Sequence, residues 1–425
     1  MLKRKEVPSF ALPSGLNILE QKTYKLNNGI QVLFVEGGTQ EVAKLDLVFA
    51  AGVVQSPKAL VAAVTNSLIH EGTESMSAFE VAEKIDFYGA YLGQSTNYHH
   101  AQITLYALSK YLPNVLPILE DIIKKPALSQ HEFDVHMAKK KQDFLVDSEK
   151  VKTLAHRKSQ EILFSADHPY GKVAKLHHFD EINLQDVKDF HQRQYASNLC
   201  TIIVSGQPGD DLQEVLNKHF GGTDWANDTK DSQELPTASP NQEHFHLEHK
   251  ENAMQSAIRI VRPSVTKDHE DFLPLQVLNT LFGGYFGSRL MNNLREEKGL
   301  TYGISSYMIS FLKAGVFGIS TEVLSEKREL AVKEVFNEMQ KLRTQDIEEE
   351  ELTRVKNFML GDLMRNLDGP FAISDASRGL LGFDLDLSYF DTLEKSIKCM
   401  TVAKIKELAN KYLVESDFYV VIAGK

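Results

Sequence analysis

The chain has 425 residues, 42% of them hydrophobic, and a formal net charge of -11. This length exceeds what one hydrophobic core usually fills, so two or more domains are expected in an ordinary globular protein. The acidic charge argues against nucleic acid as a partner and is compatible with a surface that accepts basic or neutral peptides. The two cysteines, Cys200 and Cys399, provide neither a disulfide framework nor a cysteine zinc site.

The N-terminal stretch, residues 1–20, is basic but has no apolar core of secretory length and no small-residue cleavage pattern. No run of about eighteen apolar residues occurs, so no membrane span is expected. Cytoplasm is therefore the expected location. A periplasmic location is the alternative if a signal peptide was trimmed.

The first half of the chain mixes extended and helical patterns. Asn28-Gly29 between two apolar runs predicts a two-residue hairpin, and residues 42–50 alternate like a half-buried strand. Ser77 is predicted to cap a helix that runs through Ile85. Further predicted elements are a strand at 102–107, long helices at 111–123 and 132–146, and a last strand around Cys200.

An internal repeat is the clearest sign of the architecture. Residues 199–206 read LCTIIVSG and residues 418–424 read FYVVIAG, with Gly206 and Gly424 218 positions apart. A second landmark, a helix followed by an acidic and an apolar residue, recurs with an offset of 219. We therefore predict an α+β fold of two tandem homologous units, each a mainly antiparallel sheet covered by helices on one face. The predicted boundaries are 1–220 for the first repeat, 221–242 for a polar linker and 243–425 for the second repeat.

Residues 281–305, LFGGYFGSRLMNNLREEKGLTYGIS, carry the strongest chemical signal. An apolar-periodic helix from Leu281 to Leu294 is predicted to end at a left-handed Gly299, followed by an extended run. Arg295 and Tyr302 then flank one corner. A guanidinium is a fixed fork for a carbonyl or carboxylate, and a phenol can donate to an oxygen that becomes negative during peptide-bond attack. The alternative is a surface arginine beside a half-buried strand tyrosine.

This stretch resembles the substrate-binding segment of the pitrilysin, insulin-degrading enzyme and mitochondrial processing peptidase family, which are inverted zinc peptidases. The signature R-E-x-x-G-L-x-Y runs here from Arg295 to Tyr302, and a fainter likeness extends along nearly the whole chain. The resemblance implies that these two side chains hold substrate near the metal. It also implies a half-clamshell of two sheets, each covered on one face by helices.

The zinc-binding motif of that family is absent. The resemblance places H-x-x-E-H about one helix before Gly72-Thr73, and the residues at its three functional positions are Ala63, Asn66 and Ser67. Zinc needs two imidazoles four residues apart on one helix face, with the glutamate between them as general base. Alanine and serine do not hold zinc, and asparagine is no base. Asp143 is the nearest equivalent of the family's third ligand.

No H-E-x-x-H or H-x-x-E-H occurs among the fifteen histidines, so no metal is expected in this chain. His136 is the nearest equivalent of a second family glutamate seven residues before the third ligand. The remaining candidates are expected to be structural: His70-Glu71, where Gly72 breaks the register to Glu74; the adjacent and divergent pairs His99-His100 and His177-His178; and a solvated strand face with His244, His246 and Glu248.

Three functions follow from these observations. The first is a metal-free subunit of a two-chain zinc peptidase, which contributes Arg295 and Tyr302 to peptide substrates in trans while a homologous H-x-x-E-H subunit holds the zinc. The second is a structural or peptide-binding homologue outside any catalytic complex. The third, an unaided zinc peptidase, is contradicted at positions 63, 66, 67 and 143. The retained pair favours the first function, with no cofactor in this chain.

Overall fold

A computed structural model describes residues 15–230 and 235–425 of the chain. Residues 1–14 of the N-terminal stretch and 231–234 of the predicted linker lie outside the described residues. The first half contains β1 (Gln21–Lys25), β2 (Gln31–Glu36), β3 (Val42–Phe49), α1 (Val61–Leu68), α2 (Ala78–Phe87), β4 (Tyr91–Thr96), β5 (Ala101–Leu108), α3 (Leu112–Lys124), α4 (Gln130–Ser148), α5 (Val151–Phe164), α6 (His178–Glu181), α7 (Leu184–Gln194), β6 (Cys200–Gly206) and α8 (Leu212–Phe220).

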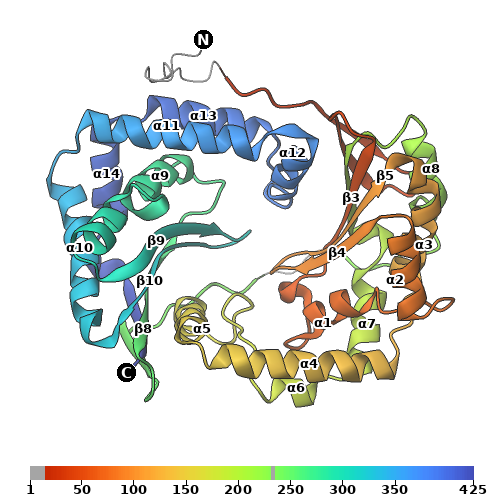
Figure 1. Cartoon of the computed structure of the whole chain (residues 1–425), viewed down its shortest axis with the longest axis horizontal. Coiled ribbons are helices and arrows are strands. Elements are labelled where there is room, and N and C mark those ends of the chain that lie inside the picture. The colour runs from red at the N-terminus through yellow and green to blue at the C-terminus, as the bar shows by residue number, and fades with distance from the viewer. Residues whose placement is uncertain (1–14, 231–234) are drawn as a thin grey trace, which may run out of the picture.

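The second half contains β7 (Phe245–His249), β8 (Gln255–Ser264), α9 (Phe272–Asn279), the π-helical segments η4 (Thr280–Gly284) and η5 (Met291–Glu297), β9 (Thr301–Ser310), β10 (Gly315–Leu324), α10 (Arg328–Thr344), α11 (Glu349–Asn366), α12 (Gly369–Arg378), α13 (Ser388–Cys399), α14 (Val402–Tyr412) and β11 (Tyr419–Gly424). The two halves lie side by side, the first on the right and the second on the left of Figure 1.

Each half is built on one mixed sheet. The strand order is β1-β2-β6-β3-β5-β4 in the first sheet and β7-β11-β8-β10-β9 in the second. β2 runs parallel to β6, β7 runs parallel to β11, and the other pairs are antiparallel. The last five strands of the first order therefore match the second order in position and direction, which confirms two copies of one mainly antiparallel unit. The repeat and linker boundaries stay a prediction.

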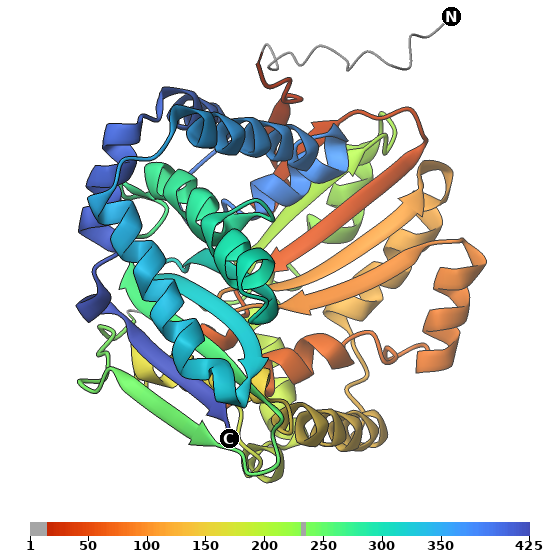
Figure 2. The same cartoon turned by 60° about the vertical axis from the view of Figure 1, so that its left-hand side comes forward.

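Each half also sends one helix to the sheet of the other half. α5 packs on β8 and β11, and α12 packs on β2 and β6 (Figures 1 and 2). The two helices begin at Val151 and Gly369, 218 positions apart, which is the offset of the sequence repeat. The expectation of helices on only one face of each sheet is therefore incomplete. The exchanged helices bury part of the second face and tie the two halves together.

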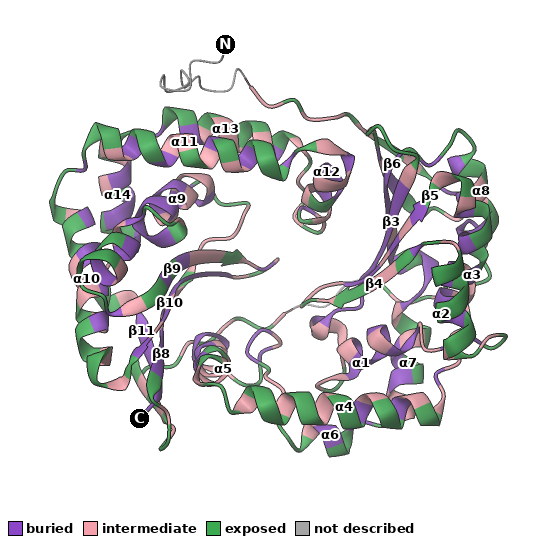
Figure 3. Ribbon diagram, viewed as in Figure 1, coloured by how far each residue is buried: buried purple, intermediate pink, exposed green. Residues whose placement is uncertain are grey.

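β3 is buried on both faces, so the prediction of a half-buried strand at residues 42–50 is wrong (Figure 3). The reason is α12, which covers the polar residues of this strand. The buried Lys44 ammonium lies 3.1 Å from Asp46 Oδ2 and 2.6 Å from Oδ1 of Asp375, a residue of α12. A buried charge of this kind requires such partners, because an unpaired one would be strongly destabilising.

The predicted hairpin is present, but its loop is longer than expected. β1 and β2 pair antiparallel, and the Leu26 N–H donates to the Ile30 carbonyl across a three-residue loop. Gly29 takes the left-handed φ of 92° that such a loop needs at its last position. Asn28 uses its side-chain amide to donate to the carbonyl of Phe220, which ties the loop to the end of α8.

The helix signals of the first half are confirmed. Ser77 Oγ accepts from the Glu80 N–H, and the Glu80 carboxylate accepts from the Ser77 N–H, forming a capping box at the start of α2. α3 and α4 match the two long predicted helices within a few residues. Within residues 15–230 and 235–425, no helix is long and apolar enough to cross a bilayer.

Candidate functional site

The Arg295 and Tyr302 corner is formed where η5 ends and β9 begins. Gly299 has a φ of 56°, which confirms the predicted left-handed break. The predicted continuous helix from Leu281 to Leu294 is wrong, because η4 ends at Gly284 and the chain turns before a second helical segment starts. Glycine is needed there: a Cβ on Gly283 would lie 2.7 Å from the backbone nitrogen of Ser306 in β9.

A β-bulge in β9 aims Tyr302 out of the sheet. Ile304 pairs with Thr321 and Thr301 with Val323, so Tyr302 and Gly303 together face one residue of β10. Two threonine hydroxyls hold the bulge: Thr321 Oγ1 donates to Thr301 Oγ1 at 2.9 Å and to the Gly303 carbonyl at 3.0 Å. Bulges commonly re-aim a side chain next to a functional site. Tyr302 is consequently 90% exposed.

Phe286 joins the pair and was not predicted from the sequence. The Arg295 guanidinium carbon lies 4.6 Å from the centre of the Phe286 ring and 5.1 Å from the centre of the Tyr302 ring. Cation–π contacts at these distances favour a fixed guanidinium orientation. Phe286 stands in the Gly-rich turn between η4 and η5, and its 63% exposure is unusual for a phenylalanine without a partner surface.

The geometry leaves the terminal nitrogens of Arg295 and the Tyr302 hydroxyl available to a ligand. Arg295 Nε lies 3.3 Å from Glu296 Oε1, and the terminal nitrogens make no hydrogen bond to a described residue. The Tyr302 hydroxyl likewise has no described partner. The corner therefore presents a guanidinium fork and a phenol donor side by side, as expected for binding a carbonyl or carboxylate.

The positions of the missing zinc motif lie on α1 and face two directions. Ala63 and Ser67 are half-buried on one stripe of the helix, and the Ser67 hydroxyl donates to the Ala63 carbonyl. Asn66 is buried instead: its Nδ2 donates to the Ser95 carbonyl at 2.8 Å, and its Oδ1 accepts from the buried Tyr195 hydroxyl at 3.0 Å. Asn66 is thus a structural joint between α1, β4 and the end of α7.

The α4 side of this site does not fit zinc either. Asp143 is exposed, and Lys140 on the same helix is half-buried. The Lys140 ammonium forms no ion pair with a carboxylate in the part of the chain that the structure describes. Zinc requires deprotonated, mostly imidazole or thiolate ligands. Ala63 and Ser67 provide none, and a nearby ammonium would repel the cation. The donor set therefore disagrees with the family's metal.

The other histidines are mostly structural, with one correction. His70 and Glu74 share no helical register, as predicted: α1 ends at Leu68, and Gly72 has a left-handed φ of 96°. His177 and His178 do not diverge; their ring centres are 4.3 Å apart, and their ligand atoms lie within 4.8 Å of one another and of Glu181. However, His178 Nδ1 accepts from a backbone N–H at 3.0 Å, so its other nitrogen carries the ring proton and is no ligand.

Of the three residues predicted on a solvated strand face, His244 precedes β7 and is exposed, whereas His246 and Glu248 lie on the half-buried face of β7. His244 stacks on Tyr419 with ring centres 4.3 Å apart, and Glu248 pairs with Lys158 of α5 at 3.1 Å. His99 Nε2 lies 3.0 Å from the Tyr170 hydroxyl and 3.4 Å from the backbone nitrogen of Leu312. The Glu248–Lys158 pair and the contact of His99 with Leu312 join the two halves.

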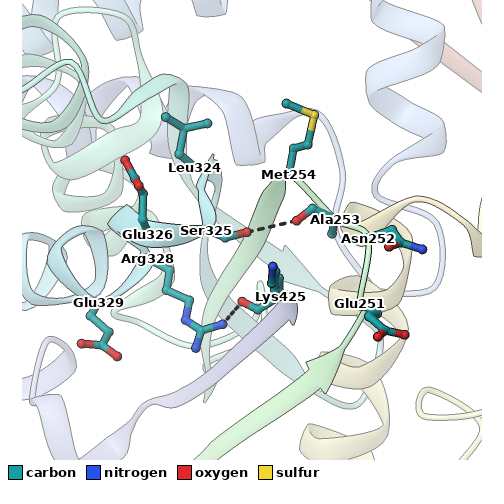
Figure 4. Close-up of a pocket in the computed structure, with 10 residues that line it drawn as sticks. All are labelled: Glu251, Asn252, Ala253, Met254, Leu324, Ser325, Glu326, Arg328, Glu329 and Lys425. Carbon is teal, nitrogen blue, oxygen red and sulfur yellow. Dashed lines mark hydrogen bonds between the residues drawn. The ribbon is translucent and has the colours of Figure 1, made fainter.

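A pocket of about 940 Å³ lies elsewhere, beside the ends of β8 and β10 (Figure 4). Its lining includes Met254, Arg328 and Lys425, and Arg328 donates to the Lys425 carbonyl. Its lining residues include neither Arg295 and Tyr302 nor any position of the missing zinc motif. The pocket therefore does not belong to the candidate site.

Two family models match the chain. "Insulinase (Peptidase family M16)" matches residues 31–167, and "Peptidase M16 inactive domain" matches residues 181–359. The chain belongs to peptidase family M16. This confirms the resemblance that the Arg295 to Tyr302 signature indicated. The first matched segment contains β2 to β5 of the first sheet, and the second contains β6 of the first sheet and β7 to β10 of the second.

Relatives of this M16 chain extend over most of its length. The beta subunit of the mitochondrial-processing peptidase of Bos taurus is 24% identical over 96% of this chain and 85% of its own. A protein of Helicobacter pylori called non-peptidase homolog YmxG is 22% identical over 93% of this chain and 92% of its own. An uncharacterized zinc protease of Bacillus subtilis is 23% identical over 82% of this chain and 84% of its own.

Solved structures agree with the fold. The M16 inactive domain structure from Pseudomonas fluorescens has a TM-score of 0.87 at 23% identity, covering 96% of this chain and 98% of its own. A protease structure from Helicobacter pylori has a TM-score of 0.85 at 19% identity, covering 96% of this chain and all of its own. The M16 half-clamshell predicted from the sequence is therefore the fold of this chain.

Proposed function

We propose that this M16 chain is the metal-free subunit of a two-chain zinc peptidase. In this proposal it presents Arg295 and Tyr302 to a peptide whose scissile bond lies at the zinc of a homologous H-x-x-E-H subunit. The observation that carries the proposal is the contrast between the halves. The second half holds an assembled and exposed Arg295 and Tyr302 corner, whereas Ala63 and Ser67 offer no zinc ligand.

Each side chain has a distinct role in the proposed reaction. The fork of Arg295 binds a peptide carbonyl or carboxylate and holds the substrate in register. The Tyr302 hydroxyl donates a hydrogen bond to the oxygen that gains negative charge when the peptide bond is attacked. The metal chemistry belongs to the partner subunit.

The relatives support a non-catalytic chain and leave two ways for it to act. One relative is named as a subunit of a peptidase, which agrees with the two-chain proposal. Another is named a non-peptidase homolog, which favours the alternative of a structural or peptide-binding protein. The exposed corner favours the first, because a purely structural role gives no reason to hold a phenol at 90% exposure.

The first test is co-purification from the native source, followed by a peptidase assay with and without a chelator. We expect a similar-sized chain with H-x-x-E-H to accompany this one and the activity of the pair to be chelator-sensitive. The isolated chain should be inactive. Recovery of the chain without any such partner would contradict the two-chain proposal and support the binding-protein alternative.

The second test uses variants of the reconstituted pair. Tyr302→Phe should lower kcat about a hundredfold or more, the usual effect of removing one oxyanion donor. Arg295→Ala should chiefly raise KM, because the fork contacts ground state and transition state alike. Tyr111→Phe and Arg193→Ala, both in the first half, are the matched controls. Full activity of both corner variants would show that the pair is structural.

A further inference from the structure

A cluster of basic side chains occupies the junction of α1 and α4, next to the positions of the missing zinc motif. His70 lies close behind the C-terminal end of α1, and His136 lies on α4. His70 Nδ1 and His136 Nε2 are buried and have no hydrogen-bond partner among residues 15–230 and 235–425. Glu71 lies 3.4 Å from His70 Nε2 and accounts for the other nitrogen of that ring. Buried ring nitrogens without partners are rare, so they require an explanation.

Lys140 makes this junction positively charged. It lies one helical turn after His136, is half-buried, and has no hydrogen bond or ion pair to a described residue. Burial lowers the pKa of Lys140, and Asp143 opposes that effect from the same helix. Burial also lowers the pKa of His136 to about 4, with further contributions from Lys140, His70 and Lys139. These groups are therefore close enough to act on one another.

We propose that the α1–α4 junction binds a carboxylate, held by the Lys140 ammonium and by the ring Nε2–H of His136. A carboxylate supplies the acceptor atoms that both donors lack, and each bond is charge-assisted. The charged or titratable side chains around the site are His70 and Glu71 at the end of α1 and His136, Lys139, Lys140 and Asp143 on α4.

The same residues disfavour a cation at the junction. A metal held by His70 and His136 would face the Lys140 ammonium in a half-buried setting, where repulsion between like charges is strong. Ala63 and Ser67 add no further ligand. The fixed positive charge at this junction is the Lys140 ammonium, and the ligand that fits it is an anion.

The carboxylate has two sources with the same chemistry, a peptide C-terminus or a small acid. The assay is histidine imidazole NMR on the ¹⁵N-labelled full chain, with NaCl replaced stepwise by sodium acetate at constant ionic strength. Acetylglycine and acetylglycinamide are the further probes. We expect acetate and acetylglycine to shift the His136 signals and acetylglycinamide to leave them unchanged. If acetylglycine binds more tightly than acetate, the source is a peptide C-terminus. If the two bind equally, the source is a small acid.

Lys140→Gln should weaken acetate binding roughly tenfold to a hundredfold, the usual range for a lost charge-assisted bond. Lys333→Gln removes the same charge from an exposed position on α10 in the second half and should leave binding within about twofold, since distant surface charges are screened. Far-UV circular dichroism checks that both variants fold. The proposal would be overturned if acetate left the His136 signals unshifted, or if it shifted them equally in the wild type and in Lys140→Gln. Stoichiometric Zn²⁺ binding that shifts His70 and His136 would overturn it as well.

Discussion

Asn66 occupies the position of the general base in the family's motif, and the structure predicts that its replacement affects stability. Asn66→Ala leaves the buried Tyr195 hydroxyl without its acceptor and removes two bonds to the carbonyls of Ser95 and Gln102. An orphaned buried group costs about 1–3 kcal/mol, and each lost bond about 0.5–1.5 kcal/mol. We expect a loss of about 3–4 kcal/mol, or roughly 10 °C in Tm for a unit of this size.

Trp225, the single tryptophan, provides a probe for this half of the chain. Its ring packs 6.4 Å from Phe49, and Phe49 packs 4.9 Å from Tyr195. Urea unfolding followed by its fluorescence therefore reports on the core next to Asn66. Asn252→Ala, at an exposed position without a described hydrogen bond, is the control and should unfold like the wild type.

A double-mutant cycle isolates the bond between Asn66 and Tyr195. Asn66→Ala combined with Tyr195→Phe should cost about 1–2 kcal/mol less than the sum of the single changes, because no hydroxyl is left orphaned. Asn66→Glu should be more destabilising than Asn66→Ala, since its carboxylate would face two carbonyl oxygens. Additive single effects, or an Asn66→Ala variant within about 0.5 kcal/mol of wild type, would refute this description of the site.

Three further predictions concern pH, the bulge and the metal. Burial, with a contribution from His100, lowers the pKa of His99 to about 4. As pH falls, His99 therefore takes up its proton in the unfolded chain before it does so in the folded chain. The free energy of unfolding should decrease between about pH 6.5 and about pH 4, by at most about 1.4 kcal/mol per pH unit for this group. The urea midpoint of His99→Gln should change less with pH than that of the wild type. His131→Gln, at an exposed position, is the control and should follow the wild type. Equal pH dependence of the midpoint in His99→Gln and wild type would contradict this prediction. Thr321→Val should cost about 1 kcal/mol in urea unfolding and lower the kcat of the reconstituted pair, because it removes two bonds that hold the bulge at Tyr302; unchanged kcat would show that the bulge does not position the phenol. Elemental analysis of the dialysed wild-type chain should find no stoichiometric zinc. A variant that combines Ala63→His, Ser67→His, Asp143→Glu and Lys140→Gln should bind zinc. If this variant folds but holds no zinc, the alignment of the motif to these positions is wrong.

The candidate site could be predicted only in part. The residue types at positions 63, 66 and 67 rule out the family's H-x-x-E-H ligands at these positions whatever the fold, because ligand chemistry belongs to the side chain itself. The left-handed break at Gly299 was also predictable, since glycine is the residue that takes this conformation without strain. Phe286 gave no such signal. Its contact with Arg295 depends on the turn between η4 and η5, and the apolar periodicity of the stretch had indicated a continuous helix instead.

The sequence by itself determined the repeated unit and its local elements, because strand and helix periodicity, caps and turn residues act over a few neighbouring positions. The offset of 218 between Gly206 and Gly424 recurs in the starts of α5 and α12. Only the tertiary structure decided that these two helices cross to the opposite sheets and that α12 buries β3. It likewise decided that Asn66 points into the core and that a bulge turns Tyr302 outward. These features arise from contacts between residues far apart in the chain, such as Lys44 with Asp375, which no local pattern encodes.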